Sequence, residues 1–177
     1  WMPLDAEPTR PESQTILVVG GGIAGISAAL EAAETGHDVV LLERGPSLGG
    51  RVTRLNRYFP KLCHPTCGLE INLKRLKANK RIRVLTLAEV AKVEGKAGDY
   101  AVTLRVKPRY VNENCTACGA CGEAVSAEIP NPFNYNLSNM KAAYLPNSMA
   151  YPQRYVLDAS IIGTPDADKA KAACKYD

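Results

Sequence analysis

The sequence predicts an α/β fold built on a parallel strand–helix–strand unit. Two apolar runs of strand length, residues 15–19 and 38–42, flank an Ala-rich segment of helical composition over residues 23–35. Gly20 to Gly22 separate the first strand from the helix, and Gly36 stands where the helix is expected to stop. All of this falls within about thirty residues, the size of a parallel crossover unit.

Length and composition indicate one globular domain with a small insert. The chain has 177 residues, of which 46% are hydrophobic and 23% charged, and this excludes disorder, collagen and coiled coil as overall descriptions. The sequence has no membrane-spanning run and no signal peptide, so we expect a cytoplasmic protein that reaches a membrane only through partner subunits. A net charge of +4 without a binding motif argues against nucleic acid as a partner.

The remaining elements follow from periodicity and turn residues. Residues 69–79 have helical spacing of leucines, and residues 82–87 form an apolar strand. Two alternating runs over residues 90–106 enclose a glycine-rich turn and predict a β-hairpin or meander. A last helical turn or two is expected over residues 166–176. We divide the chain into a tail, a dinucleotide-binding region with the hairpin, and a Cys-rich irregular insert, at residues 1–14, 15–108 and 109–177.

The glycines after the first strand predict a Rossmann-like dinucleotide site. In Gly20-x-Gly22-x-x-Gly25, the first glycine permits the tight turn, the second admits a pyrophosphate, and the third lets helix and strand pack closely. Glu43 ends the second strand, where a carboxylate binds ribose hydroxyls and disfavours a 2′-phosphate, which argues against NADP. The predicted cofactor contacts of this turn are Gly20, Gly21, Gly22, Ile23, Ala24 and Gly25.

A second glycine motif favours FAD over NAD. Arg44 follows the ribose-binding acid, and Leu48-Gly49-Gly50-Arg51 comes shortly afterwards. This spacing resembles the second glycine motif of flavoproteins with two dinucleotide-binding domains, where a Gly-Gly pair lies near the FAD diphosphate. Taken alone, the Gly-Gly pair is equally consistent with a flexible turn.

Three cysteines two residues apart predict an iron–sulfur site. Cys115, Cys118 and Cys121 form CxxCxxC, but Val125 and Ser126 occupy the positions of the last Cys-Pro of bacterial ferredoxins. A single [4Fe–4S] cluster then needs a remote fourth ligand, for which Cys174 is favoured over Cys63 or Cys67. Zinc bound by thiolates is the alternative, and three free thiols are the structural alternative.

Cys63 and Cys67 leave three interpretations open. The three residues between them match neither of the redox spacings of disulfide reductases, and Pro65 is expected to prevent a helical placement. A redox pair, cluster ligands and plain structural thiols are equally compatible with the sequence.

These motifs together resemble the A subunit of heterodisulfide reductase, most closely the version found in the quinone-interacting membrane-bound oxidoreductase complex. The resemblance covers most of the chain from Thr15 onward. It rests on the two glycine motifs and on three further stretches, Cys63-His64-Pro65-Thr66-Cys67-Gly68-Leu69-Glu70-Ile71-Asn72, Tyr110-Val111-Asn112-Glu113-Asn114-Cys115-Thr116-Ala117-Cys118-Gly119, and Phe133-Asn134-Tyr135 with Lys141-Ala142-Ala143-Tyr144-Leu145-Pro146.

The resemblance implies an oxidoreductase subunit that relays electrons between FAD and a [4Fe–4S] cluster in a ferredoxin-like insert, within sulfur or quinone-linked energy metabolism. Its partners would be the other subunits of such a complex, and no residue of the chain is predicted to be catalytic. A late strand that completes FAD domains of this class is missing, so we expect an N-terminal fragment that by itself is inactive and binds FAD poorly. The alternatives are a fragment of a pyridine-nucleotide disulfide reductase using Cys63 and Cys67, and a non-enzymatic zinc-binding interaction module.

Overall fold

The computed structural model describes residues 14–57 and 59–176, so most of the expected tail, residues 1–13, lies outside the described residues. A three-stranded parallel sheet in the order β1-β2-β3 forms the first part of the chain. Two helices alternate with its strands, in the chain order β1 (Thr15–Val19), α1 (Ile23–Glu34), β2 (Asp38–Glu43), α2 (Thr66–Ala78) and β3 (Ile82–Thr86). The predicted α/β class and the crossover unit are confirmed.

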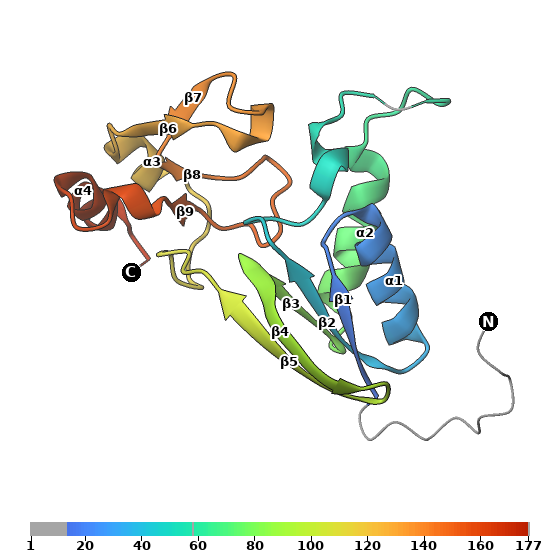
Figure 1. Ribbon diagram of the computed structural model, residues 1–177. Helices are drawn as coiled ribbons and strands as arrows, with labels where there is room; N and C mark the ends of the chain where they lie inside the picture. Colours follow the sequence, from blue (N-terminus) through green and yellow to red (C-terminus); the bar gives the residue numbers. More distant parts are fainter. Residues whose placement is uncertain (1–13, 58, 177) are drawn as a thin grey trace, which may run out of the picture.

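Both helices cover the same face of the sheet and pack against each other (Figure 1). The buried side chains of this core come from one stripe of each helix, from β2 and, for Leu48, from the loop that follows β2. Their helical spacing of three and four residues explains why these segments fold as helices on a sheet. The core members are Ile26, Ala29, Leu30, Ala33, Val39, Leu41, Leu48, Leu69, Leu73 and Leu76.

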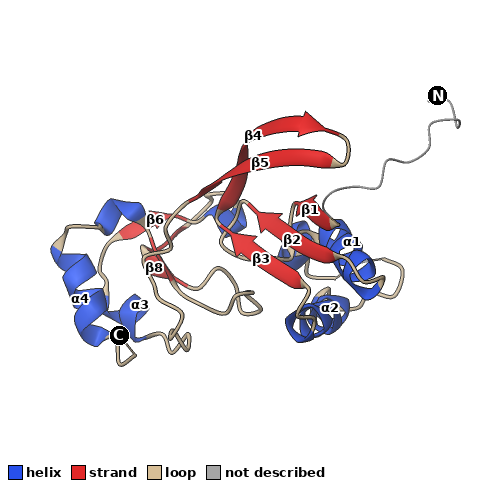
Figure 2. Ribbon diagram, turned by 90° about the horizontal axis from the view of Figure 1, so that it is seen from below, coloured by secondary structure: helices blue, strands red, loops and turns tan. Residues whose placement is uncertain are grey.

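The predicted hairpin is present and is longer than expected. Its strands β4 (Ala88–Lys96) and β5 (Asp99–Val106) pair antiparallel, with a register shift between Val90 and Lys92. Figure 2 shows the hairpin on the side of the sheet away from α1 and α2.

The last third of the chain forms short elements around a second small core. The buried residues there are Val125, Ala142, Ala143, Ile161 and Ala170. Two two-stranded sheets, β6-β7 and β8-β9, occur where the sequence suggested little regular structure. In chain order the elements are α3 (Ala120–Ala124), β6 (Glu128–Pro130), β7 (Asn139–Lys141), β8 (Ala143–Tyr144), β9 (Val156–Leu157) and α4 (Pro165–Ala173), with 3-10 turns η1 (Gly50–Arg54), η2 (Pro132–Asn134) and η3 (Ala159–Ile161).

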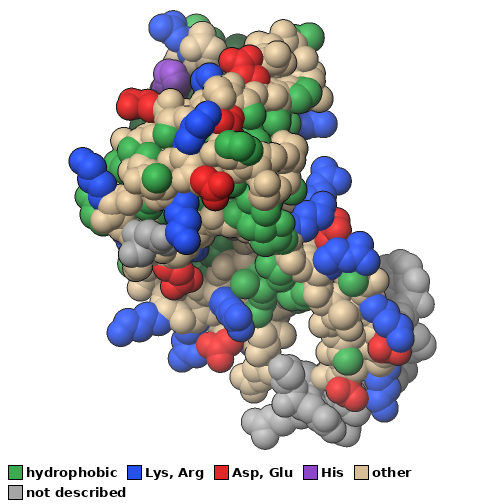
Figure 3. Space-filling model, turned by 90° about the vertical axis from the view of Figure 1, so that its left-hand side faces the viewer, with side chains coloured by type: hydrophobic (Ala, Val, Ile, Leu, Met, Phe, Trp, Pro, Cys, Tyr) green, Lys and Arg blue, Asp and Glu red, His purple; other side chains and the backbone are tan. Residues whose placement is uncertain are grey.

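The surface carries no dominant charge on the face drawn in Figure 3, where basic and acidic side chains are interspersed. Among residues 14–57 and 59–176, no helix is both long and apolar enough to cross a membrane.

Candidate functional site

The glycine turn after β1 leaves open space in front of α1. Gly20 has a φ of +108°, and its N–H donates to Leu42 O over 2.8 Å, so the chain reverses tightly at the end of the sheet. A Cβ on Gly25 would lie 1.8 Å from Gly20 O, so only glycine fits there. A Cβ on Gly22, the N-cap of α1, would meet no atom within 4 Å. Free N–H groups at such a helix start are suited to bind phosphate.

The second glycine motif packs directly against the first. Gly49 N donates to Gly21 O over 2.7 Å, and a Cβ on Gly50 would lie 3.1 Å from Gly22 Cα. Both residues of the Gly-Gly pair have positive φ, +108° and +54°, a conformation that favours glycine. The two motifs, about thirty residues apart in the sequence, therefore form one backbone surface.

Glu43 lies between the two glycine motifs. Its carboxylate accepts hydrogen bonds from Gly21 N over 2.7 Å and from Gly45 N over 2.6 Å, which fixes its orientation at the end of β2. The carboxylate also lines a cavity, with acceptor capacity left for hydroxyl donors. The neighbouring Arg44, also predicted to touch cofactor, is exposed and does not line that cavity.

The loop over residues 45–50 is anchored by distant parts of the chain. Arg109 Nη2 donates to Pro46 O over 2.5 Å, and Tyr151 N donates to Ser47 Oγ over 2.9 Å. Both donors, Arg109 and Tyr151, belong to the part of the chain that follows the hairpin. We call this contact between the loop over residues 45–50 and the last part of the chain the junction.

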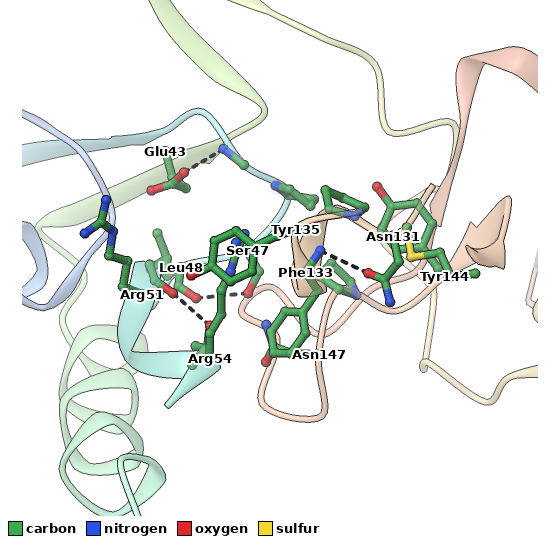
Figure 4. A pocket seen from close by; sticks show the side chains of 17 residues that line it. Glu43, Ser47, Leu48, Arg51, Arg54, Asn131, Phe133, Tyr135, Tyr144 and Asn147 are labelled. Atoms are coloured by element: carbon green, nitrogen blue, oxygen red, sulfur yellow. Dashed lines mark hydrogen bonds between the residues drawn. The ribbon is translucent and has the colours of Figure 1, made fainter. Parts of the chain in front are cut away.

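A cavity of about 440 Å³ opens beside this loop (Figure 4). Glu43, Arg51 and Arg54 lie on one side of it, and Asn131, Phe133 and Tyr144 lie on the other. Clefts between two parts of a chain are common ligand sites. These residues fit a dinucleotide, because glycine backbone, a carboxylate able to accept from hydroxyl groups and two guanidinium groups lie together.

All four predicted cluster ligands line a second cavity, of about 490 Å³. They are Cys115, Cys118, Cys121 and Cys174. Cys121 lies in the first turn of α3, and Cys174 is the residue that directly follows α4. Within the part of the chain that the structure describes, no three or more His, Cys, Asp or Glu side chains are arranged to hold a metal ion. The four cysteines nevertheless line one cavity, and a [4Fe–4S] cluster is held by four thiolates, each bound to a different iron atom.

Two of the four cysteines, Cys115 and Cys121, are half-buried, whereas Cys118 and Cys174 are exposed. Burial raises the pKa of the Cys121 thiol, and the neighbouring Cys115 raises it further because two thiolates repel. Ala117 N points at Cys115 Sγ over 3.5 Å, the kind of backbone donor that stabilises thiolate sulfur. The raised pKa disfavours the thiolate, which is the form of cysteine that binds metal.

Cys63 and Cys67 line neither cavity. Cys67 is exposed in the first turn of α2, and Cys63 is half-buried just before the helix. As expected, the pair does not lie on one helix, because Cys63 precedes α2 and only Cys67 lies within it. Pro65 is the N-cap of α2, where the missing N–H of proline costs no intrahelical hydrogen bond.

Two residues between the cavities were missed at the sequence level. Arg109 bonds to both sides of the junction, and burial lowers the pKa of its guanidinium. Tyr144 lies in β8 and lines the first cavity. Strand β8 pairs with β9, and Tyr155, the residue just before β9, lines the second cavity. No local pattern marks these residues. An arginine in a segment poor in acidic partners, next to Pro108, was the nearest available signal.

Comparison with known proteins gives a consistent result. Residues 15–113 match the family described as FAD dependent oxidoreductase. The chain is 42% identical over 149 residues to the iron-sulfur A subunit of CoB–CoM heterodisulfide reductase from Methanocaldococcus jannaschii, a match that covers 82% of this chain and 22% of that protein. It is 41% identical over 142 residues to an iron-sulfur A subunit of the same enzyme from Methanopyrus kandleri, covering 80% and 22%.

The chain thus spans about a fifth of the length of these relatives. Among solved structures, L-proline dehydrogenase from P. horikoshii aligns with a TM-score of 0.44 and 24% identity, over 54% of this chain and 20% of that one.

Proposed function

Since the chain belongs to the FAD dependent oxidoreductase family, we propose that it binds FAD and one [4Fe–4S] cluster and relays electrons between them within a heterodisulfide reductase-like complex. When bound, FAD exchanges electrons in pairs or singly, and the cluster exchanges them one at a time. The observation that carries the proposal is the presence of two cavities in one chain, one beside the glycine motifs and one lined by four cysteines.

The residues of the glycine turn and of the cavity beside it have separate tasks in this proposal. Gly20, Gly22 and Gly25 seat the diphosphate at the start of α1, and Glu43 accepts hydrogen bonds from a ribose. The Gly49–Gly50 backbone covers the other side of the diphosphate, and Arg51 supplies a balancing positive charge.

In the second cavity, Cys115, Cys118, Cys121 and Cys174 would each hold one iron atom. Arg109 donates to Pro46 O, which lines the first cavity, and to Arg154 O, which precedes Tyr155 of the second cavity, so it would hold the two binding sites in a fixed relation. The protein thus supplies position and electrostatic environment, and the cofactors supply the chemistry.

The wider role is proposed from the relatives. Those named above are subunits of heterodisulfide reductase complexes, which supports other subunits of such a complex as partners. The resemblance stated from the sequence motifs, closest to the quinone-interacting version, supports a place in sulfur or quinone-linked energy metabolism.

Anaerobic purification of the intact protein tests the proposal. Absorbance spectra, extracted flavin, iron and acid-labile sulfide are measured per chain. We expect FAD together with about four iron and four sulfide. Zinc in place of iron would favour an interaction module. Flavin without metal, together with a redox-active Cys63–Cys67 pair, would favour a disulfide reductase.

A further inference from the structure

The cavity beside the glycine motifs continues into a neighbouring cavity of about 320 Å³. The two share lining residues from both walls, among them Thr53, Phe133 and Tyr144. Glu43 lies at one end, and Thr66, the first residue of α2, lies at the other. The two cavities are contiguous, and we refer to them together as the groove, whose lining extends from Glu43 to Thr66.

The two walls of this groove have different chemistry. The wall from the glycine-motif side carries Glu43, Arg51 and Arg54. The opposite wall comes from the Cys-rich part of the chain and is mainly aromatic and apolar, with Phe133, Tyr135, Met140, Tyr144 and Pro146. A planar apolar ring is the ligand group that such a wall accommodates best.

The aromatic wall faces a cation across the groove. The Arg54 guanidinium carbon lies 5.0 Å from the centre of the Tyr135 ring and 5.7 Å from that of Phe133. Both distances are within the range of cation–π attraction. Arg54 follows the Gly-Gly motif directly in η1, so this contact ties the aromatic wall to the diphosphate-binding loop.

The loop that presents these rings is held by its own hydrogen bonds. Asn131 Oδ1 accepts from Phe133 N over 3.0 Å, Asn131 O accepts from Asn136 N over 2.8 Å, and Asn131 N donates to Ser138 O over 2.8 Å. The side chain of Tyr135 nevertheless remains 68% exposed. An exposed aromatic ring on a braced loop is preorganised for a partner that stacks on it.

We propose that the tricyclic ring system of FAD binds against Phe133 and Tyr135, so that the segment carrying the cysteines also forms one wall of the flavin site. The inference rests on the proposed function, which places the ribose at Glu43 and the diphosphate at the glycine motifs. The ring at the far end of the dinucleotide then lies beyond Gly50, toward Thr53 and Thr66. FAD binding and docking of the Cys-rich segment are therefore coupled.

The two phenylalanines of the chain provide a matched test. Phe133→Leu removes a ring from the groove, and Phe59→Leu removes an 87% exposed ring that lines neither cavity. Affinities for FAD and for ADP, which lacks the flavin ring, are measured on the intact protein by titration. We expect Phe133→Leu to weaken FAD binding about five- to tenfold and to leave ADP binding within about twofold. Phe59→Leu should change neither affinity.

The outcomes distinguish a failure of the proposed flavin-ring site from a failure of the proposed FAD-binding function. Tyr135→Leu, at an exposed position, repeats the test without a risk to folding and should again weaken FAD binding alone. Unchanged FAD affinity in both variants overturns the inference while the proposed function stands. An equal loss of FAD and ADP affinity also overturns it, because the wall then contacts the adenine. A wild-type protein that binds neither ligand overturns the proposed function itself.

Discussion

Arg109 Nη2 donates a hydrogen bond of 2.9 Å to Thr86 Oγ1, which ties the segment leading into Cys115 to the end of β3. The same nitrogen reaches Pro46 O, and Nη1 donates to Arg154 O over 3.3 Å. One half-buried guanidinium thus joins the dinucleotide loop, the parallel sheet and the β8-β9 connection. Burial lowers its pKa, yet an arginine keeps its charge in proteins, so the junction contains a permanent positive charge.

We expect Arg109→Gln to lower the free energy of unfolding by about 2–3 kcal/mol, because acceptors at the junction lose a charged donor. Urea unfolding at neutral pH measures the change. Arg105→Gln is the matched control, since that side chain is exposed and pairs with Glu89 over 3.8 Å. The control should change stability by less than about 1 kcal/mol. Equal effects in the two variants would show that Arg109 does not hold the junction together.

Two substitutions in the glycine turn separate folding from cofactor binding. Gly25→Ala places a Cβ 1.8 Å from Gly20 O, so we expect strong destabilisation. Gly22→Ala meets no atom within 4 Å, so the protein should fold with a loss below about 1 kcal/mol. The new methyl group would instead occupy the space of the diphosphate and weaken FAD binding. Thermal unfolding and FAD titration of both variants check this contrast, and tight FAD binding by Gly22→Ala would contradict the assigned position of the diphosphate.

The strand–helix–strand unit was predictable because its signals are local. The strand, the glycine turn and the helix between Thr15 and Glu43 are specified by neighbouring residues, and the fold class was confirmed. The start of α2 at Thr66 was not predictable in the same way, because Pro65 is compatible with either a broken helix or a helix start, and here it starts one.

The junction was not predictable, because its contacts are between residues far apart in the chain. The acceptors of Arg109 lie 23, 45 and 63 positions away in the sequence. The aromatic wall was not predictable for the same reason, because Arg54 contacts Phe133 and Tyr135 across about eighty positions of the sequence. Short strands such as β8 and β9 carry too few residues to show a period.

The carboxyl group of Asp166 makes the stability of the Cys-rich part depend on pH. Its carboxylate accepts from Lys169 Nζ over 2.8 Å, from Ala127 N over 2.6 Å and from the Ser126 hydroxyl and N–H, which holds its pKa well below the ordinary 3.8. A lowered folded-state pKa adds stability above the unfolded-state pKa, and this stability is lost as the pH falls through the folded-state pKa.

We therefore expect cluster-free protein to lose stability progressively as the pH falls below about 5. Asp166→Asn should be less stable at pH 7 and should show a smaller loss between about pH 5 and pH 3. Asp168→Asn, an exposed acid in the same helix, is the control and should follow the wild type. Urea unfolding at a series of pH values measures both. Parallel pH profiles for wild type and Asp166→Asn would contradict the role of this carboxylate.

The central claim is that one cluster is held by Cys115, Cys118, Cys121 and Cys174, and the iron content of two cysteine variants tests it most directly. Cys174→Ala removes a thiol from the cavity, and Cys67→Ala removes an exposed thiol outside it. Both proteins are reconstituted anaerobically beside the wild type, and iron and acid-labile sulfide are measured per chain. We predict about four iron and four sulfide for wild type and Cys67→Ala, and clearly less iron for Cys174→Ala. Equal iron in Cys174→Ala and wild type, or a wild type without iron, would contradict the claim.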